Sequence, residues 1–229
     1  VTKIVFNYRM FGKEFSDNIL KNNPLYIFNV FGNNASLDIK NDVNSLLRRN
    51  SINDELTLKA YQLMKEKGME LDKVIVHSPY IVNLCNEANF DFSVSFLTQE
   101  VERCNELGIR YMVLHPGSSV NMERSRASYN ISKGLSYILD NTKSSNVMIL
   151  LETMAGKGNE MGKCFEEIRD IIDSVNDNSR LGVCMDTCHL WDAGYDIAGD
   201  LDGVLEEFDH VIKMGRTQMQ DAVPIRLGQ

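Results

Sequence analysis

Four short apolar runs, each closed by a polar side chain, dominate the hydrophobic pattern of this chain. They are residues 74–80 (VIVHSPY), 111–117 (YMVLHPG), 147–158 (VMILLETMAGKG) and 181–189 (LGVCMDTCH). Each begins as a stretch of strand length that is rich in β-branched residues, which predicts a β-strand. The polar side chains that close the runs follow one another at intervals of 38, 37 and 34 residues. That spacing accommodates one strand, one helix and two loops, so the runs predict successive βα units.

Amphipathic patterns predict the helices of these units. The predicted helices cover residues 54–67, 93–107, 125–140, 164–175 and 200–212. Gly68 and Gly108 follow the first two, at positions where helices commonly end. Residues 3–7 and 25–30 are weaker candidates for two further strands nearer the N-terminus.

The regular alternation of strands and helices predicts an α/β fold with a single domain over residues 1–212. No Pro-, Gly- or Ser-rich linker interrupts the alternation. A closed (β/α)8 barrel needs eight such units, usually in about 250 residues. The two weak strands and the four clear ones supply about six. The predicted fold is therefore a TIM-type (β/α) barrel that is incomplete.

Composition narrows the class of protein without naming a function. The 229 residues are 43% apolar and 24% charged, as in ordinary soluble domains. No apolar run approaches the ~20 residues that cross a bilayer, and no signal-peptide pattern opens the chain. A cytoplasmic monomer is expected, with its five cysteines as reduced thiols of the core. The net charge of −8 disfavours broad binding to polyanions but does not exclude an enzyme that acts on nucleic acid.

The polar residues that end the four runs predict a metal site. His77, His115, Glu152 and Asp186 end consecutive runs, and His189 follows shortly after. In a parallel barrel the C-terminal ends of the strands form the catalytic face. A single such histidine could be a satisfied core residue, but imidazoles and carboxylates gathered in one place are costly to bury without a cation. These ligand types favour a divalent metal, zinc above all, with Glu152 placed to bridge two ions.

Other residues near the runs allow two interpretations each. Tyr80 could stack against DNA or be an aromatic residue at the rim of the core. Arg48 and Arg49 could contact phosphates or begin a solvated helix. Cys184 and Cys188 flank the last carboxylate and could be thiolate ligands, although oxygen and imidazole ligands already account for the site.

Several motifs together resemble the endonuclease IV family of apurinic/apyrimidinic (AP) endonucleases. They are VHSPYIVNL, LGIRYMVLHPGS, LLETMAGKGNEMG, FEEI…IID and RLGVCMDTCHLWDAGYDI, within about residues 46–212. The resemblance implies a zinc-dependent TIM barrel that cleaves double-stranded DNA 5′ to abasic sites during base excision repair. It also implies three zinc ions that hold the phosphate.

The resemblance implies a role for each candidate ligand. His77 and His115 match ligands of the first zinc, and Glu152 matches the carboxylate that bridges the first and second. Asp186 matches a ligand of the second zinc, and His189 a ligand of the third. Glu152 and Asp186 would also orient the attacking hydroxide, which makes them the catalytic candidates.

The resemblance also implies DNA contacts, and it stops before the family's last motifs. Tyr80 resembles a residue that wedges bent DNA, and Arg48 and Arg49 resemble part of a DNA-contacting loop. The family's later ligands, in an HxND-type motif, a D-x-H pair and a final Glu, have no counterpart after Ile212. One or two zinc ions are therefore expected here rather than three. The last residues, 213–229, are instead similar to a short segment of the aspartase/fumarase lyases, which suggests a junction or an unrelated tail.

Three functions remain open at this point. The first is an AP endonuclease, whose activity in this truncated form is itself open because later ligands are missing. The second is a metal-dependent sugar isomerase or epimerase, since barrels of that kind also place Glu, Asp and His at strand ends. The third is a non-catalytic remnant, because missing strands would expose sheet edges that a closed barrel hides.

Overall fold

A computed structural model describes residues 28–29, 54–66, 71 and 74–212 of the chain. Its five strands form one parallel sheet in sequence order, so each strand lies beside the one before it. The strands are β1 (Phe28–Asn29), β2 (Val74–His77), β3 (Tyr111–Leu114), β4 (Met148–Glu152) and β5 (Leu181–Cys184). Parallel neighbours in sequence order require a crossover after each strand, which is the connectivity of a barrel wall. Each of the four apolar runs contains a strand, as predicted.

The helices follow the predicted amphipathic segments to within a few residues. They are α3 (Asp54–Glu66), α4 (Phe90–Glu106), α5 (Arg124–Asn141), α6 (Phe165–Asp173) and α8 (Leu201–Val211). Two short 3-10 helices, η2 (Glu87–Asn89) and η3 (Lys157–Asn159), and the helix α7 (Thr187–Ala193) were not predicted. Gly108, with φ of +67°, lies just beyond α4, where the left-handed conformation favours glycine.

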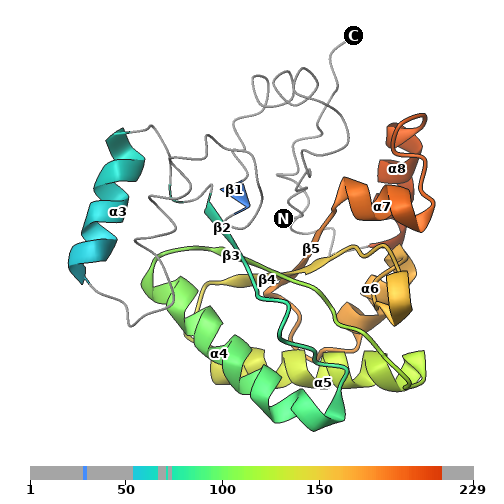
Figure 1. Cartoon of the computed structure of the whole chain (residues 1–229), viewed down its shortest axis with the longest axis horizontal. Helices are drawn as coiled ribbons and strands as arrows, with labels where there is room; N and C mark the ends of the chain where they lie inside the picture. Colours follow the sequence, from blue (N-terminus) through green and yellow to red (C-terminus); the bar gives the residue numbers. More distant parts are fainter. Residues whose placement is uncertain (1–27, 30–53, 67–70, 72–73, 213–229) are drawn as a thin grey trace.

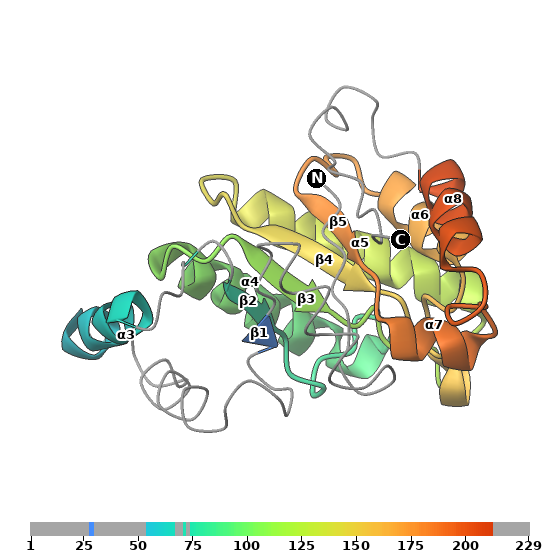
Figure 2. The ribbon, with the colours of Figure 1, turned by 90° about the horizontal axis from the view of Figure 1, so that it is seen from above.

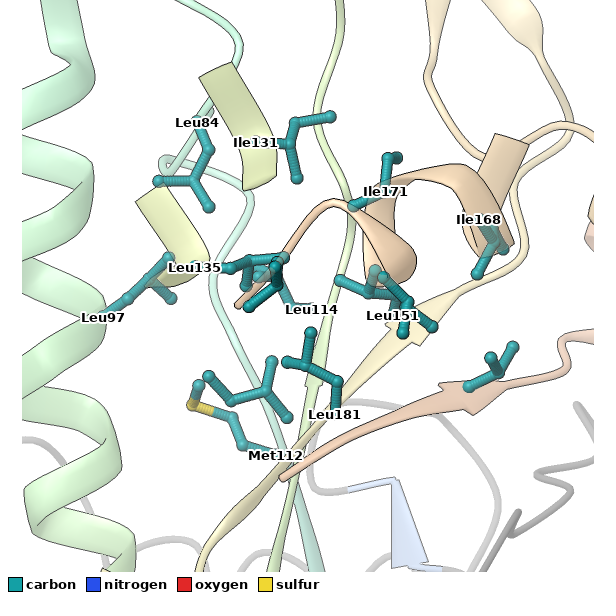
Figure 3. Close-up of a cluster of buried hydrophobic side chains, with 14 of the residues drawn as sticks. Leu84, Leu97, Met112, Leu114, Ile131, Leu135, Leu151, Ile168, Ile171 and Leu181 are labelled. Carbon is teal, nitrogen blue, oxygen red and sulfur yellow. The ribbon is translucent and has the colours of Figure 1, made fainter. Parts of the chain in front are cut away.

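The main core lies between the sheet and the helices that cover one of its sides (Figures 1 and 2). Figure 3 shows Leu114 and Leu151 from the strands among Leu97 of α4, Leu135 of α5 and Ile168 of α6. Helix α5 includes a glycine where it crosses the loop after β2. A Cβ at Gly134 would lie 2.8 Å from Leu84 Cδ2, so a larger residue would require the buried Leu84 side chain to shift.

A second buried cluster occupies the opposite side of the sheet. Its members are Ile75, Tyr111, Val113, Leu150 and Cys184. On β3 these positions alternate with those that belong to the main core, as the two-residue period of a strand requires. The strands are thus buried on both faces, which explains why their sequences are continuously apolar rather than alternating.

The expectation of five core thiols is wrong for two cysteines. None of the five forms a disulfide within the described residues, and Cys85, Cys104 and Cys184 are buried. Burial raises the pKa of the Cys85 and Cys104 thiols to about 12, so they are unreactive at neutral pH. Cys164, the N-cap of α6, is however exposed, and Cys188, in α7, is half-buried.

The weaker N-terminal predictions are only partly covered. Strand β1 lies inside the predicted strand at residues 25–30. The candidate strand at residues 3–7 and the segment 213–229 fall outside the described residues. Within the described part, no helix is long and apolar enough to cross a membrane.

Candidate metal centre

The strand register brings the predicted ligands to one edge of the sheet. His77 ends β2 and Glu152 ends β4, while His115 directly follows β3. Asp186 lies two residues beyond β5. Because the strands are parallel and nearly level, all these residues lie at their C-terminal ends.

Two imidazoles converge on one carboxylate oxygen. His77 Nε2 lies 2.8 Å from Glu152 Oε2, and His115 Nε2 lies 3.0 Å from the same atom. Glu152 is 5% exposed, so this contact is shielded from water. His77 Nδ1 lies 2.8 Å from the carbonyl oxygen of Ser78, to which it must donate. His77 Nε2, which faces the carboxylate, therefore has two possible states. It either carries a proton, as part of an imidazolium, or presents a free lone pair that can bind a cation.

A second group of potential ligands shares Glu152. Glu152, Asp186 and His189 each offer a ligand atom within 4.8 Å of the others, as do His77, His115 and Glu152. His189 lies on α7, and its Nδ1 lies 2.8 Å from Thr153 O and 3.6 Å from Glu152 Oε1. Glu152 is thus the one side chain common to both groups, as a bridging carboxylate would be.

Asp186 is placed by its local structure. It is the N-cap of α7, and its Oδ1 accepts hydrogen bonds from the backbone N–H of Cys188 (2.7 Å) and of His189 (3.0 Å). Its own N–H donates to Thr153 Oγ1 at 2.9 Å. These bonds fix the carboxylate of Asp186 within the second ligand group.

The electrostatics of the centre favour a cation. Burial works to raise the pKa of Glu152, but the imidazoles of His115 and His77 outweigh it and hold that pKa at about 2. Burial works to lower the pKa of His77, and the bond to Glu152 and its negative charge raise that pKa above its ordinary value. The carboxylate is therefore ionised at neutral pH and attracts positive charge.

One buried imidazole nitrogen has a charged neighbour but no hydrogen bond within the described residues. His115 Nε2 makes no hydrogen bond within the described part of the chain, although it approaches Glu152. A buried polar atom without a partner is costly, and a metal ion would satisfy it. Imidazole and carboxylate donors are also the set that zinc accepts. The residues therefore fit a divalent metal.

The remaining candidate residues are placed unequally. Tyr80 is 80% exposed, and its ring lies 4.7 Å from that of His115, so it is a surface aromatic rather than part of the core. Arg48 and Arg49 lie outside the described residues. Cys184 is fully buried below the centre, and burial raises its pKa well above the ordinary value. It packs in the second buried cluster and belongs to neither ligand group, which disfavours the thiolate alternative at this position.

Thr153 is a supporting residue that the sequence interpretation missed. Its carbonyl oxygen holds His189 and its hydroxyl oxygen holds the backbone of Asp186. It is 1% exposed and directly follows Glu152. A hydroxyl residue immediately after a predicted ligand could have indicated this role, because metal ligands are commonly oriented by such neighbours.

Comparison with known proteins relates this geometry to two kinds of barrel. The family model described as xylose isomerase-like TIM barrel matches residues 39–224. "Probable endonuclease 4" of Acholeplasma laidlawii (strain PG-8A) is 59% identical over 155 residues, which are 67% of this chain and 53% of that protein. "Probable endonuclease 4" of Staphylococcus aureus (strain Newman) is 45% identical over 175 residues, 75% of this chain and 58% of that protein.

Solved structures give the same picture of the fold. The structure of endonuclease IV from Thermus thermophilus matches with a TM-score of 0.59 and 26% identity, over 93% of this chain and 72% of that one. A D-tagatose 3-epimerase-like protein matches with a TM-score of 0.55 and 21% identity, over 69% of this chain and 58% of that one. The predicted TIM-type fold is confirmed. The chain spans little more than half the length of these curated relatives. Neither of them is a lyase by name, so the predicted resemblance of residues 213–229 to the aspartase/fumarase lyases is unsupported.

Proposed function

The chain belongs to the xylose isomerase-like TIM barrel family, and from that premise we propose that it is an AP endonuclease of the endonuclease IV type. Its substrate would be double-stranded DNA, cleaved 5′ to an abasic site as in base excision repair. The observation that carries the proposal is the pair of ligand groups that share Glu152 at the C-terminal edge of the sheet. The 59% identity to a protein named "Probable endonuclease 4" supports the nuclease over the other activities that such a barrel can hold.

The described side chains suit phosphodiester hydrolysis. His77, His115, Glu152, Asp186 and His189 would hold one or two zinc ions. Bound there, zinc supplies a Lewis acid that activates water and stabilises negative charge on phosphate oxygens. Glu152 and Asp186 would orient the attacking water, since both are buried and held by hydrogen bonds or ion pairs at the same edge. Fixed, water-shielded carboxylates need little reorganisation during the reaction.

Cleavage of a defined duplex tests the proposal. A labelled duplex with one abasic site is expected to be cut 5′ to that site by the zinc-loaded protein, leaving a 3′-hydroxyl. The same duplex without the lesion should stay intact, and a chelator should abolish the cut. Bound zinc is counted in parallel on the purified protein. A protein that contains zinc but leaves the abasic duplex uncut contradicts the proposal.

The epimerase alternative has weaker support. The D-tagatose 3-epimerase-like structure is 21% identical, which is a likeness of fold alone. Isomerisation of a ketose sugar in the absence of DNA cleavage would establish that alternative. Absence of zinc, cleavage and sugar turnover together would leave the non-catalytic remnant.

Tyr80 is expected to contribute to DNA binding. It is 80% exposed beside His115, so Tyr80→Ala removes little packing but deletes an aromatic surface at the proposed site. Loss of a base–aromatic contact weakens binding by about 1–3 kcal/mol, or roughly 5- to 150-fold. Fluorescence anisotropy with an abasic duplex measures this change, while the zinc content and the melting temperature should stay unaltered. Equal affinity of the parent and the variant would remove Tyr80 from the DNA interface.

A further inference from the structure

The side-chain amide of Asn83 joins the loops that carry two of the proposed ligands. Asn83 lies in the loop after β2, which begins beyond His77, and Ser118 lies in the loop after β3, which begins with His115. Asn83 Nδ2 donates to Ser118 O at 2.9 Å, and Asn83 Oδ1 accepts from Ser118 N at 3.2 Å. Oδ1 also accepts from Cys85 N at 3.1 Å, which fixes the amide within its own loop. The amide of Asn83 thus bonds both the backbone N–H and the backbone carbonyl of Ser118, as the backbone of a paired strand would.

The connection continues into the loop after β4, which begins beyond Glu152. Ser118 forms an isolated antiparallel bridge with Glu160 of that loop. Arg124, at the start of α5, donates to the carbonyl oxygen of Glu160 at 3.0 Å. The same guanidinium makes two hydrogen bonds to Glu167 of α6, of 2.9 and 2.8 Å. Three successive loops at the ligand edge are therefore tied into one unit. Asn83 joins the first loop directly to the second, while Asn130 of α5 holds the first loop further along, at the carbonyl oxygen of Cys85 (2.9 Å).

His115 depends on this unit more than the other histidines do. His77 Nδ1 is held by the carbonyl oxygen of Ser78, and His189 Nδ1 by that of Thr153. Among the described residues, no comparable carbonyl holds His115. The rings of His77 and Tyr80 pack against it, and no backbone hydrogen bond in the described part of the chain orients it, so its direction depends strongly on the backbone of its own loop. Asn83 binds that loop at Ser118, three residues beyond His115.

We propose that Asn83 is a positioning residue for the metal centre, which acts by holding the His115 loop at a fixed distance from the His77 loop. The inference rests on the proposed function, since it concerns the same ligands. Asn83 itself touches neither metal nor substrate. Its role is to place His115 Nε2 opposite Glu152, so that both groups reach one ion without prior rearrangement.

Gly117 provides an independent indication of how closely the loops approach. Its φ is +125°, and a Cβ built on it would lie 2.4 Å from Asn83 Oδ1 and 2.9 Å from Cys85 Sγ. A side chain at this position would therefore displace the amide of Asn83. Gly117→Ala is expected to reproduce the metal-binding defect of Asn83→Ala, and the two changes together should cost less than the sum of their separate effects.

The test measures metal affinity and metal environment rather than activity alone. Asn83→Ala removes the link, and Asn83→Asp keeps its size but cannot donate to Ser118 O. Competition with a chromogenic chelator should show zinc affinity about 10- to 100-fold below that of the parent for both variants, the range found when groups that orient a ligand are lost. The visible spectrum of the cobalt-substituted protein should change in band position or intensity, because His115 would no longer be aligned.

A matched control separates positioning from general destabilisation. Asn178→Ala removes another amide, which donates to Ile172 O at 3.2 Å near the start of β5, at the opposite end of the sheet. This variant should lose some thermal stability but keep the parent's zinc affinity and cobalt spectrum. If Asn83→Ala and Asn83→Asp also keep both, the positioning role is refuted while the nuclease proposal stands. If the parent binds neither metal, the metal centre and the positioning role both fail.

Discussion

Glu152→Gln is expected to lower the zinc affinity of the centre by more than about 100-fold, since loss even of groups that only orient a ligand costs 10- to 100-fold. Glu152 belongs to both ligand groups and is the carboxylate on which His77 and His115 converge. The amide is nearly the same size but carries no charge, so it attracts a cation far less strongly. Cleavage of abasic duplex should fall at least in proportion at limiting zinc. Calorimetric titration with zinc and the duplex assay measure the two effects.

The matched control for this variant is Glu166→Gln. Glu166 is an exposed residue in the first turn of α6, outside both ligand groups. The substitution makes the same change of charge, and it should leave zinc affinity and cleavage unaltered. Equal zinc affinity and equal cleavage in Glu152→Gln and Glu166→Gln would mean that the metal, if bound, lies elsewhere. Loss of cleavage with retained affinity would instead assign Glu152 to the chemistry alone.

The strands and the positions of the proposed ligands could be predicted because both depend on local pattern. A strand of a parallel barrel is buried on both faces, so its sequence is a continuous run of apolar residues. The residue that ends the run must then lie at the C-terminal edge, next to the ends of the neighbouring strands. His77, His115 and Glu152 could be placed together on this reasoning alone, and their side chains do meet.

The supporting contacts could not be predicted because they join loops that are distant in the chain. Asn83 and Ser118 are separated by 35 residues, and Thr153 and His189 by 36. Polar loop residues of these types occur throughout the sequence, and only the three-dimensional path of the loops determines which of them meet. Helix α7 was missed for a different reason. It has seven residues, too few for an apolar period to be evident. Its N-cap, Asp186, also serves as a predicted ligand, so that residue alone does not indicate the start of a helix.

Phe165→Ala is expected to destabilise the described domain by about 3–5 kcal/mol, the usual cost of deleting a buried aromatic ring. Phe165 begins α6 and is fully buried. Its ring lies 4.6 Å from that of Tyr195 and 5.2 Å from that of Phe208 of α8, so it joins the segments that follow β4 and β5. At about 2–4 °C per kcal/mol for a chain of this size, the melting temperature should fall by roughly 6–20 °C.

Thermal unfolding followed by circular dichroism measures this change, with Phe92→Ala as the control. Phe92 lies on α4 and is 49% exposed, so its truncation should change stability by only about 0.5 kcal/mol or less. A similar loss for both variants would contradict the packing described around Phe165. Zinc affinity at a temperature where Phe165→Ala is folded should equal that of the parent, because this ring lies apart from the ligands. A loss of affinity there would instead show that the packing of α6 against α8 determines the geometry of the ligand edge.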